Sequence, residues 1–118
     1  NLQYGEVDEE IKEFERDTGI EIIQCLSVDN REDLDGLAAL IELCDLVVST
    51  SNVTIHLAGA LGKETWVLLP YVANFWWLLE RTDSVWYPSL TLYRQKTLKD
   101  WDSIAIELEE DLKKKFNT

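Results

Sequence analysis

The chain has 118 residues, a length suited to one compact domain, and we predict a single domain over residues 1–118. With 46% hydrophobic and 29% charged residues, and only 5 Gly and 2 Pro, the composition is that of a folded protein rather than a disordered or collagen-like chain. The 23 acidic residues outnumber the 11 basic ones, and the net charge of −12 repels a nucleic-acid backbone and an anionic membrane surface. We therefore expect no nucleic-acid partner.

Localisation and redox state are predicted from what the sequence lacks. No apolar run approaches the roughly 20 residues that span a bilayer, and residues 1–3 do not resemble a signal peptide. The absence of Met, even as an initiator, indicates a fragment of a longer protein. Cys25 and Cys44 lie among apolar neighbours without CxxC spacing, which predicts buried free thiols. We expect a cytoplasmic protein without a membrane span.

Short apolar runs alternate with amphipathic stretches, a pattern typical of strand–helix–strand units around a mostly parallel sheet. In the first part of the chain this pattern predicts the tail of a strand at residues 2–4, an acidic helix over 6–17 and a strand at 20–25. After a polar loop at 27–33, a helix carries apolar residues from Leu34 to Ile41.

The second part of the chain continues the α/β pattern. The predicted elements are a fully apolar central strand at 45–49, a helix at 56–61, a strand at 65–69, an aromatic-rich loop over 75–88, a strand at 90–93 and a helix at 101–116. Gly62 is predicted to end the helix at 56–61, and Gly59 to let that helix approach the sheet closely.

The loop over residues 50–54 is the first candidate site. In an open parallel sheet, ligands bind beyond the carboxyl ends of the strands, and a helix N-terminus there offers backbone N–H groups to an anion. The hydroxyl, amide and backbone donors of this loop can therefore converge on phosphate oxygens. Ser, Thr and Asn are also ordinary helix caps, and a hydrogen-bonded structural role is equally open for His56.

Other sites lack support in the sequence. There is no GxGxxG fingerprint, no GxxxxGK[ST] loop and no GxSxG motif. One histidine and two separated cysteines cannot assemble a tetrahedral metal site. We expect neither a metal nor a cofactor.

Residues 44–70 carry a resemblance to a known family; they read CDLVVSTSNVTIHLAGALGKETWVLLP. This run resembles the C-terminal domain of heptosyltransferase-like glycosyltransferases, family nine. The later residues Trp77–Leu79, Arg81, Trp86–Pro88 and Arg94–Gln95 are similar to the bacterial subgroup in which this domain follows tetratricopeptide repeats. The opening residues 2–5 resemble the first strand of the same domain.

The resemblance implies the C-terminal, Rossmann-like half of a GT-B fold, with three layers and a mostly parallel sheet flanked by helices. This half binds the nucleotide-sugar donor, while a missing N-terminal half supplies the acceptor side and usually the catalytic base. By the same resemblance, the residues that face the donor diphosphate are Ser51, Asn52, Val53, Thr54 and His56, with Gln3 and Tyr4 at the rim of the cleft. Helix-dipole and hydrogen-bond donors, rather than a metal, stabilise the leaving diphosphate in such enzymes.

The chain departs from the family pattern at five positions, of which three are Ala73, Phe75 and Val85, where the subgroup often has Pro, Trp and Pro. Where this chain has Ser51, family members commonly have Asp, and where it has Trp76 the subgroup often has Arg. Three cations remain as candidate phosphate partners, namely Lys63, Arg81 and Arg94. The departures favour an alternative function, a catalytically inactive glycosyltransferase-like domain that serves as a binding or scaffold module. An unrelated small-molecule sensor of similar fold is a third hypothesis.

Overall fold

The structure is a computed structural model that describes residues 1–116. Two compact units divide the chain, Asn1–Leu43 and Cys44–Thr118. The prediction of one domain over residues 1–118 stays a prediction.

The first unit contains two helices, α1 (Asp8–Thr18) and α2 (Leu34–Leu43), which confirms both helices predicted there. Helix α1 begins with three acidic residues, as the partial positive charge of a helix N-terminus favours. It ends at Gly19, whose φ of 70° lets its N–H reach the Glu15 carbonyl. At the start of α2, Asp33 Oδ1 accepts a hydrogen bond from the Gly36 N–H at 2.8 Å.

The two strands predicted in this unit, at 2–4 and 20–25, are wrong: neither segment is a strand in the structure. Their backbone groups bond to side chains and to the chain terminus instead of to a ladder. The Ile22 N–H donates to Glu15 Oε1 at 2.8 Å, and the terminal ammonium donates to the Ile23 carbonyl at 2.7 Å. The Gln3 carbonyl accepts from Asn30 Nδ2. Although this segment is apolar, it pairs with no neighbouring strand, and Ile23 is 79% exposed.

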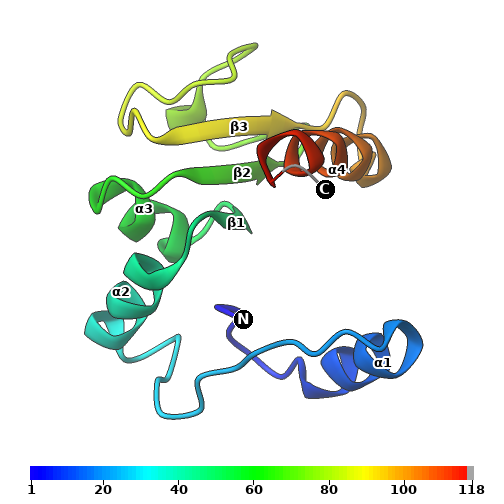
Figure 1. The fold of residues 1–118 in the computed structure, drawn as a ribbon. Coiled ribbons are helices and arrows are strands. Elements are labelled where there is room, and N and C mark those ends of the chain that lie inside the picture. The colour runs from blue at the N-terminus through cyan, green and yellow to red at the C-terminus, as the bar shows by residue number, and fades with distance from the viewer. Residues whose placement is uncertain (117–118) are drawn as a thin grey trace. The chain divides into compact units, whose positions relative to one another are not determined.

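The second unit is built on a three-stranded parallel sheet, in the order β1 (Val47–Thr50), β2 (Thr65–Leu69), β3 (Leu90–Arg94) (Figure 1). Val47 pairs with Thr65, which pairs with Leu90 on its other side. All three strands therefore end at one edge of the sheet. This arrangement confirms the predicted fold class, a Rossmann-like α/β domain with helices flanking a parallel sheet.

Both faces of this sheet are covered, which gives the unit three layers. On one face, Ile55 of α3 (Val53–Ala60) and Trp77 of the short 3-10 helix η1 (Phe75–Trp77) pack on Val67 and Leu92. On the other face, α4 (Trp101–Phe116) brings its core residue Ile104 against Trp66 and Tyr93 of the sheet. The strand prediction succeeded here because β2 is buried on both sides, so its sequence is almost continuously apolar.

A buried hydroxyl ties α4 to the sheet. The Tyr93 hydroxyl donates to Asp111 Oδ2 at 2.8 Å, and the Tyr93 side chain is only 5% exposed. Burial, and then the hydrogen bond to the Asp111 carboxylate, raise the pKa of Tyr93 far above its ordinary value of 10.0. The folded chain therefore keeps this proton at a pH where the unfolded chain releases it.

We expect the stability contributed by Tyr93 to be present below about pH 10 and to be lost as the pH rises above it. The unfolded state binds fewer protons there, so the free energy of unfolding falls by about 1 kcal/mol between roughly pH 9 and pH 11. Urea unfolding at both pH values should show this extra loss in the native chain and not in Tyr93→Phe. Tyr4→Phe, at an exposed tyrosine, is the control and should behave as the native chain. An equal fall in the native chain and in Tyr93→Phe would contradict the buried hydroxyl.

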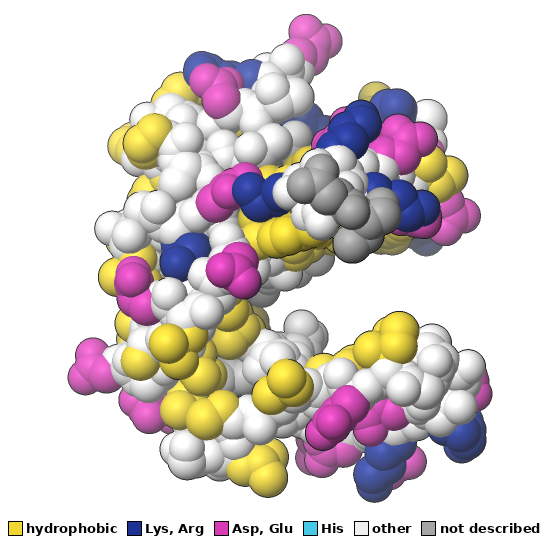
Figure 2. All heavy atoms as spheres, in the orientation of Figure 1, with side chains coloured by type: hydrophobic (Ala, Val, Ile, Leu, Met, Phe, Trp, Pro, Cys, Tyr) yellow, Lys and Arg dark blue, Asp and Glu magenta, His cyan; other side chains and the backbone are white. Residues whose placement is uncertain are grey.

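The acidic excess is not evenly distributed. Residues 1–43 contain 13 acidic and 3 basic residues, whereas residues 44–118 contain 10 acidic and 8 basic ones. On α4 the two signs are interspersed (Figure 2), and ion pairs join Lys113 to Glu109 and Lys115 to Glu64. The second unit is therefore close to neutral.

Neither cysteine is in a disulfide, as predicted, but the prediction that both are buried is wrong. Cys25 is exposed, because residues 20–25 form no strand and pair with no neighbouring strand. Cys44, directly after α2, is only partly exposed. Among the described helices, none has both the length and the apolar character needed to cross a membrane.

Candidate functional site

The predicted phosphate loop begins where β1 ends. Asn52 caps α3: its Oδ1 accepts from the Thr54 N–H at 3.0 Å, and its Nδ2 donates to Ser49 Oγ at 3.1 Å. The helix consequently starts at Val53, three residues before the predicted start. Thr50 belongs to the strand, so only Ser51 and Asn52 connect the two elements. The sequence offered several good caps in a row, and hydrogen-bond geometry selects Asn52.

Ser51 is anchored by a buried tryptophan. The indole Nε1 of Trp77 donates to Ser51 Oγ at 3.1 Å, and the Trp77 side chain is 1% exposed. Because the serine oxygen accepts this bond, its own hydroxyl proton is still able to donate. Trp77 of η1 therefore holds the chain segment that follows β1 in place.

His56 lies among three aromatic rings. Its Nδ1 is 3.2 Å from the Tyr87 hydroxyl, and its ring stacks on Trp77 with centroids 5.7 Å apart. Trp76 and Tyr87 approach the imidazole edge-on at 6.1 and 5.8 Å. The imidazole is therefore positioned by the aromatic loop that the sequence placed at 75–88.

The remaining predicted site residues are spread over the chain. Thr54 is buried at 3% exposure, and Val53 is 46% exposed. Gln3 and Tyr4 belong to the first unit, whereas Ser51 to His56 belong to the second. The predicted convergence of the two groups on one cleft stays a prediction.

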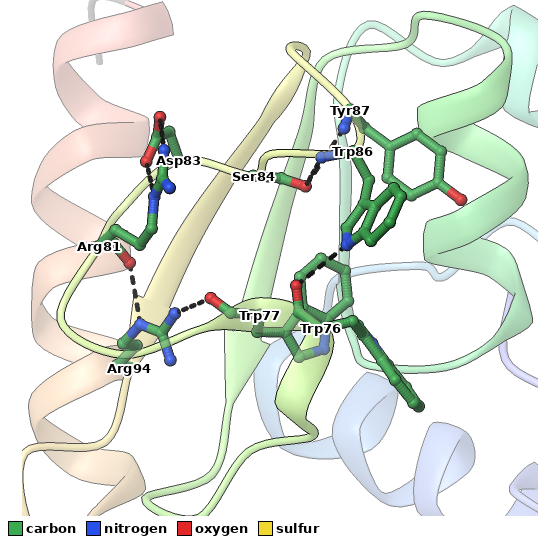
Figure 3. A network of polar contacts seen from close by, with 8 residues as sticks. All are labelled: Trp76, Trp77, Arg81, Asp83, Ser84, Trp86, Tyr87 and Arg94. Atoms are coloured by element: carbon green, nitrogen blue, oxygen red, sulfur yellow. Dashed lines mark hydrogen bonds and ion pairs between the residues drawn. The ribbon is translucent and has the colours of Figure 1, made fainter.

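The three candidate cations all have partners within the protein. Arg81 forms a two-point ion pair with Asp83, at 2.7 and 2.8 Å (Figure 3). Mutual hydrogen bonding raises the pKa of Arg81 and lowers that of Asp83. Lys63 donates to the Cys44 carbonyl at 2.8 Å. Arg94 donates to the carbonyls of Trp77 and Arg81, and burial lowers the pKa of its guanidinium.

The aromatic loop is closed by its own polar contacts (Figure 3). Ser84 Oγ accepts from the backbone N–H groups of both Trp86 and Tyr87, at 3.1 and 3.2 Å. The Trp86 indole donates to the Trp76 carbonyl at 3.2 Å, although its ring is 64% exposed. These hydrogen bonds within the loop hold Tyr87 beside His56.

A pocket of about 280 Å³ opens at the carboxyl edge of the sheet. Its lining comes from the ends of β1 and β2, the loop after β2 and the start of α4: Thr50, Ser51, Leu69, Pro70, Val72, Asn74 and Trp101. An apolar wall with a few polar groups is the usual character of a small-molecule site. The position agrees with the rule that parallel sheets bind ligands beyond their carboxyl ends.

Thr50 and Ser51 of the predicted phosphate loop line this pocket, whereas the other predicted site residues of the second unit, Asn52, Val53, Thr54 and His56, do not. Asn74 and Trp101 line it without having been predicted. Pro70, directly after an apolar strand, was a usable signal for the second loop of the pocket. Trp101 carried no such signal, because nothing in the sequence indicates that the start of the last helix lies beside the end of β1. Among the described residues, no group of three or more His, Cys, Asp or Glu side chains could hold a metal ion.

Comparison with known proteins found one informative relative. The chain is 39% identical over 102 residues to Protein FlbA of Caulobacter vibrioides, an alignment that covers 86% of this chain and 17% of the relative. No family model matches the chain, and no solved structure matches it. The chain therefore spans about a sixth of the length of this relative.

Proposed function

We propose that the chain is the nucleotide-sugar donor-binding domain of a bacterial glycosyltransferase, which transfers a sugar from a nucleotide diphosphate sugar to an acceptor. In this proposal an N-terminal glycosyltransferase half, and tetratricopeptide repeats in the same protein, complete a cytoplasmic enzyme. The resemblance of residues 44–70 supports the family, and one structural observation carries the binding function. That observation is the pocket beside Ser51 and Trp101 at the carboxyl edge of the parallel sheet.

The groups around this pocket suit a nucleotide. Trp101, 43% exposed, offers an aromatic wall on which a base can stack. In this proposal the Ser51 hydroxyl proton and the polar groups of Thr50 and Asn74, which line the pocket, bond ribose or phosphate oxygens. The unit that contains them has 10 acidic and 8 basic residues, so its own charges repel a diphosphate only weakly.

In the reaction that we propose, the chain holds the donor and stabilises the departing nucleoside diphosphate. The N-terminus of α3 and the Ser51 hydroxyl would share that task, since both favour developing negative charge on the leaving oxygens. The acceptor and the catalytic base would come from the N-terminal half.

A second candidate function is a glycosyltransferase-like module that has lost transfer activity and serves in binding or as a scaffold. The observation in its favour is that Lys63, Arg81 and Arg94 each have a partner within the protein. The Asn52 amide and His56 Nδ1 are likewise engaged with neighbouring groups.

Titration of the ¹⁵N-labelled chain with ADP-glucose, GDP-glucose and UDP-glucose separates the two functions. We expect one nucleotide to shift the amides of Thr50 to Asn52 and the indole of Trp101. Trp101→Leu should weaken that binding about tenfold, since stacking on a base contributes roughly 1–3 kcal/mol. Trp86→Leu removes an exposed indole outside the pocket and should leave binding unchanged.

No shift at Thr50 to Asn52 with millimolar ligand, in a chain that keeps its folded spectrum, would refute donor binding by this chain. That outcome would favour the scaffold function.

A further inference from the structure

A second pocket, of about 390 Å³, lies beyond the carboxyl ends of β2 and β3. Its lining includes Tyr71, Leu79, Glu80 and Gln95, none of which was predicted to bind phosphate, together with Ala73, the candidate phosphate partner Arg94, and Val72, which also lines the pocket beside Ser51. Tyr71, Val72 and Leu79 are 57%, 77% and 85% exposed, so apolar surface stands open around the pocket.

Gln95 gives this pocket a buried donor without a partner. The side chain is 5% exposed, and its Oε1 accepts from the Tyr71 N–H at 2.9 Å. That bond fixes the orientation of the amide, because a backbone N–H requires the oxygen. The amide nitrogen is buried and has no hydrogen-bond partner among residues 1–116. An unpaired buried donor is unfavourable, and an acceptor group that enters the pocket and bonds this nitrogen would remove that cost.

Arg94 holds residues 78–80, two of which line this pocket, in an unusual backbone conformation. Its guanidinium bonds the carbonyls of Trp77 and Arg81, which bracket residues 78–80 (Figure 3). Leu78 and Glu80, between these carbonyls, both have φ of 57°, and Leu78 has ψ of −164°. Residues other than glycine rarely adopt the Leu78 conformation. The clamp therefore holds Leu79 and Glu80 at the pocket against a local conformational cost.

We propose that this pocket binds a polyhydroxylated ligand of the size of a sugar ring. Hydroxyl groups both accept and donate, so they match the Gln95 amide donor and the Glu80 carboxylate, which forms no ion pair with the described residues. The apolar C–H face of a sugar ring matches Tyr71 and Leu79. An inorganic anion fits less well because the Glu80 carboxylate lines the pocket, and a purely apolar ligand would leave the Gln95 amide unpaired.

The test is a titration of the ¹⁵N-labelled chain with D-glucose, D-galactose and N-acetyl-D-glucosamine, with inorganic phosphate as the anionic comparison. We expect at least one sugar to give saturable shifts of the Tyr71 amide and of the Gln95 side-chain NH₂, with a millimolar dissociation constant. Gln95→Glu keeps the oxygen that accepts from Tyr71 and removes the donor, and should weaken binding about tenfold. Gln24→Glu, the same change at an exposed glutamine, should leave sugar binding unaltered.

Glu80→Gln provides a second variant at an exposed position that does not disturb the core. It should also weaken sugar binding, whereas an anion site would bind phosphate more tightly after this change. Saturable binding of phosphate but of none of the sugars, no saturable binding at all, or undiminished sugar binding in Gln95→Glu and Glu80→Gln would each overturn the proposal. Val72 lines both this pocket and the candidate nucleotide pocket, so the two proposals are told apart by their other reporters: nucleotide shifts are expected at Thr50 to Asn52 and Trp101, and sugar shifts at Tyr71 and Gln95.

Discussion

Replacing Trp77 with alanine is expected to lower the free energy of unfolding by about 3–5 kcal/mol, the usual cost of removing a large buried aromatic side chain. Trp77 is 1% exposed and packs in the core cluster that joins α3 to β2 and β3. Its removal opens a cavity, leaves the Ser51 hydroxyl without its indole donor and ends the stacking on His56. Urea unfolding followed by circular dichroism measures this loss.

The matched control is Trp86→Ala, which removes the same side chain from the same loop at a position that is 64% exposed. We expect that variant to lose less than about 1 kcal/mol, because little apolar surface leaves the core. Trp77→Phe should fall between the two, since it keeps a buried ring but loses the indole donor and part of the buried volume. If Trp77→Ala and Trp86→Ala cost the same, Trp77 does not occupy the core position described here.

The Trp77→Ala variant also links the core to the candidate nucleotide pocket. Because the indole holds Ser51, the amides of residues 50–56 should shift in the variant without any ligand, and nucleotide binding should weaken with them. Trp86→Ala should leave these amides in place.

The sequence predicted the second unit best where a strand is buried on both faces, as β2 is. The prediction of a fully apolar central strand at 45–49 is wrong in part, because β1 lies at the edge of the three-stranded sheet and Val48 is 40% exposed. Thr65–Leu69 was predicted with its observed limits, since an apolar run of five residues ended by Pro70 has few other structures open to it. The last helix was predicted over Trp101–Phe116 because its apolar positions recur at the helical period. In both elements the local pattern and the tertiary environment agree.

The first unit shows where such patterns stop being sufficient. Residues 20–25 have the composition of a strand, yet a strand forms only when a neighbouring strand completes its hydrogen bonds. Here the backbone groups bond to the Glu15 side chain and to the N-terminal ammonium instead. The candidate site shows the same limit. Ser51 was found from its position after a strand, whereas the role of Gln95 depends on the Tyr71 N–H and on a loop 15 to 17 residues away, contacts that no local pattern encodes.

Gly59→Ala is expected to destabilise the chain by about 2 kcal/mol, although alanine favours a helix over glycine by roughly 1 kcal/mol. The sequence predicted close approach of this glycine to the sheet, and the structure corrects the neighbour: a Cβ added at Gly59 would lie 2.5 Å from Cγ of the Tyr87 ring. Cγ lies on the Cβ–Cγ axis, so turning the ring about that bond does not relieve the overlap; the whole side chain or its backbone has to move.

Tyr87 is held at both ends, which is why it cannot give way cheaply. Its hydroxyl bonds His56, its N–H donates to Ser84 Oγ, and its carbonyl accepts from the Leu90 N–H at 3.2 Å, directly before β3. Moving the ring by the required distance would break at least one of these bonds or shift the start of the strand.

The sign of the effect should reverse when the ring is removed. In a Tyr87→Ala background the overlap is gone, and Gly59→Ala should then stabilise the chain by up to about 1 kcal/mol through helix propensity alone. Urea unfolding of the four chains in this double-mutant cycle, at constant m value, measures both the cost of the overlap with Tyr87 and the gain from helix propensity. A Gly59→Ala variant that is as stable as the native chain in the presence of Tyr87 would mean that the ring does not cover this turn of α3. The aromatic loop would then not hold His56 as described, since the same ring that excludes a Cβ at Gly59 carries the hydroxyl beside His56 Nδ1.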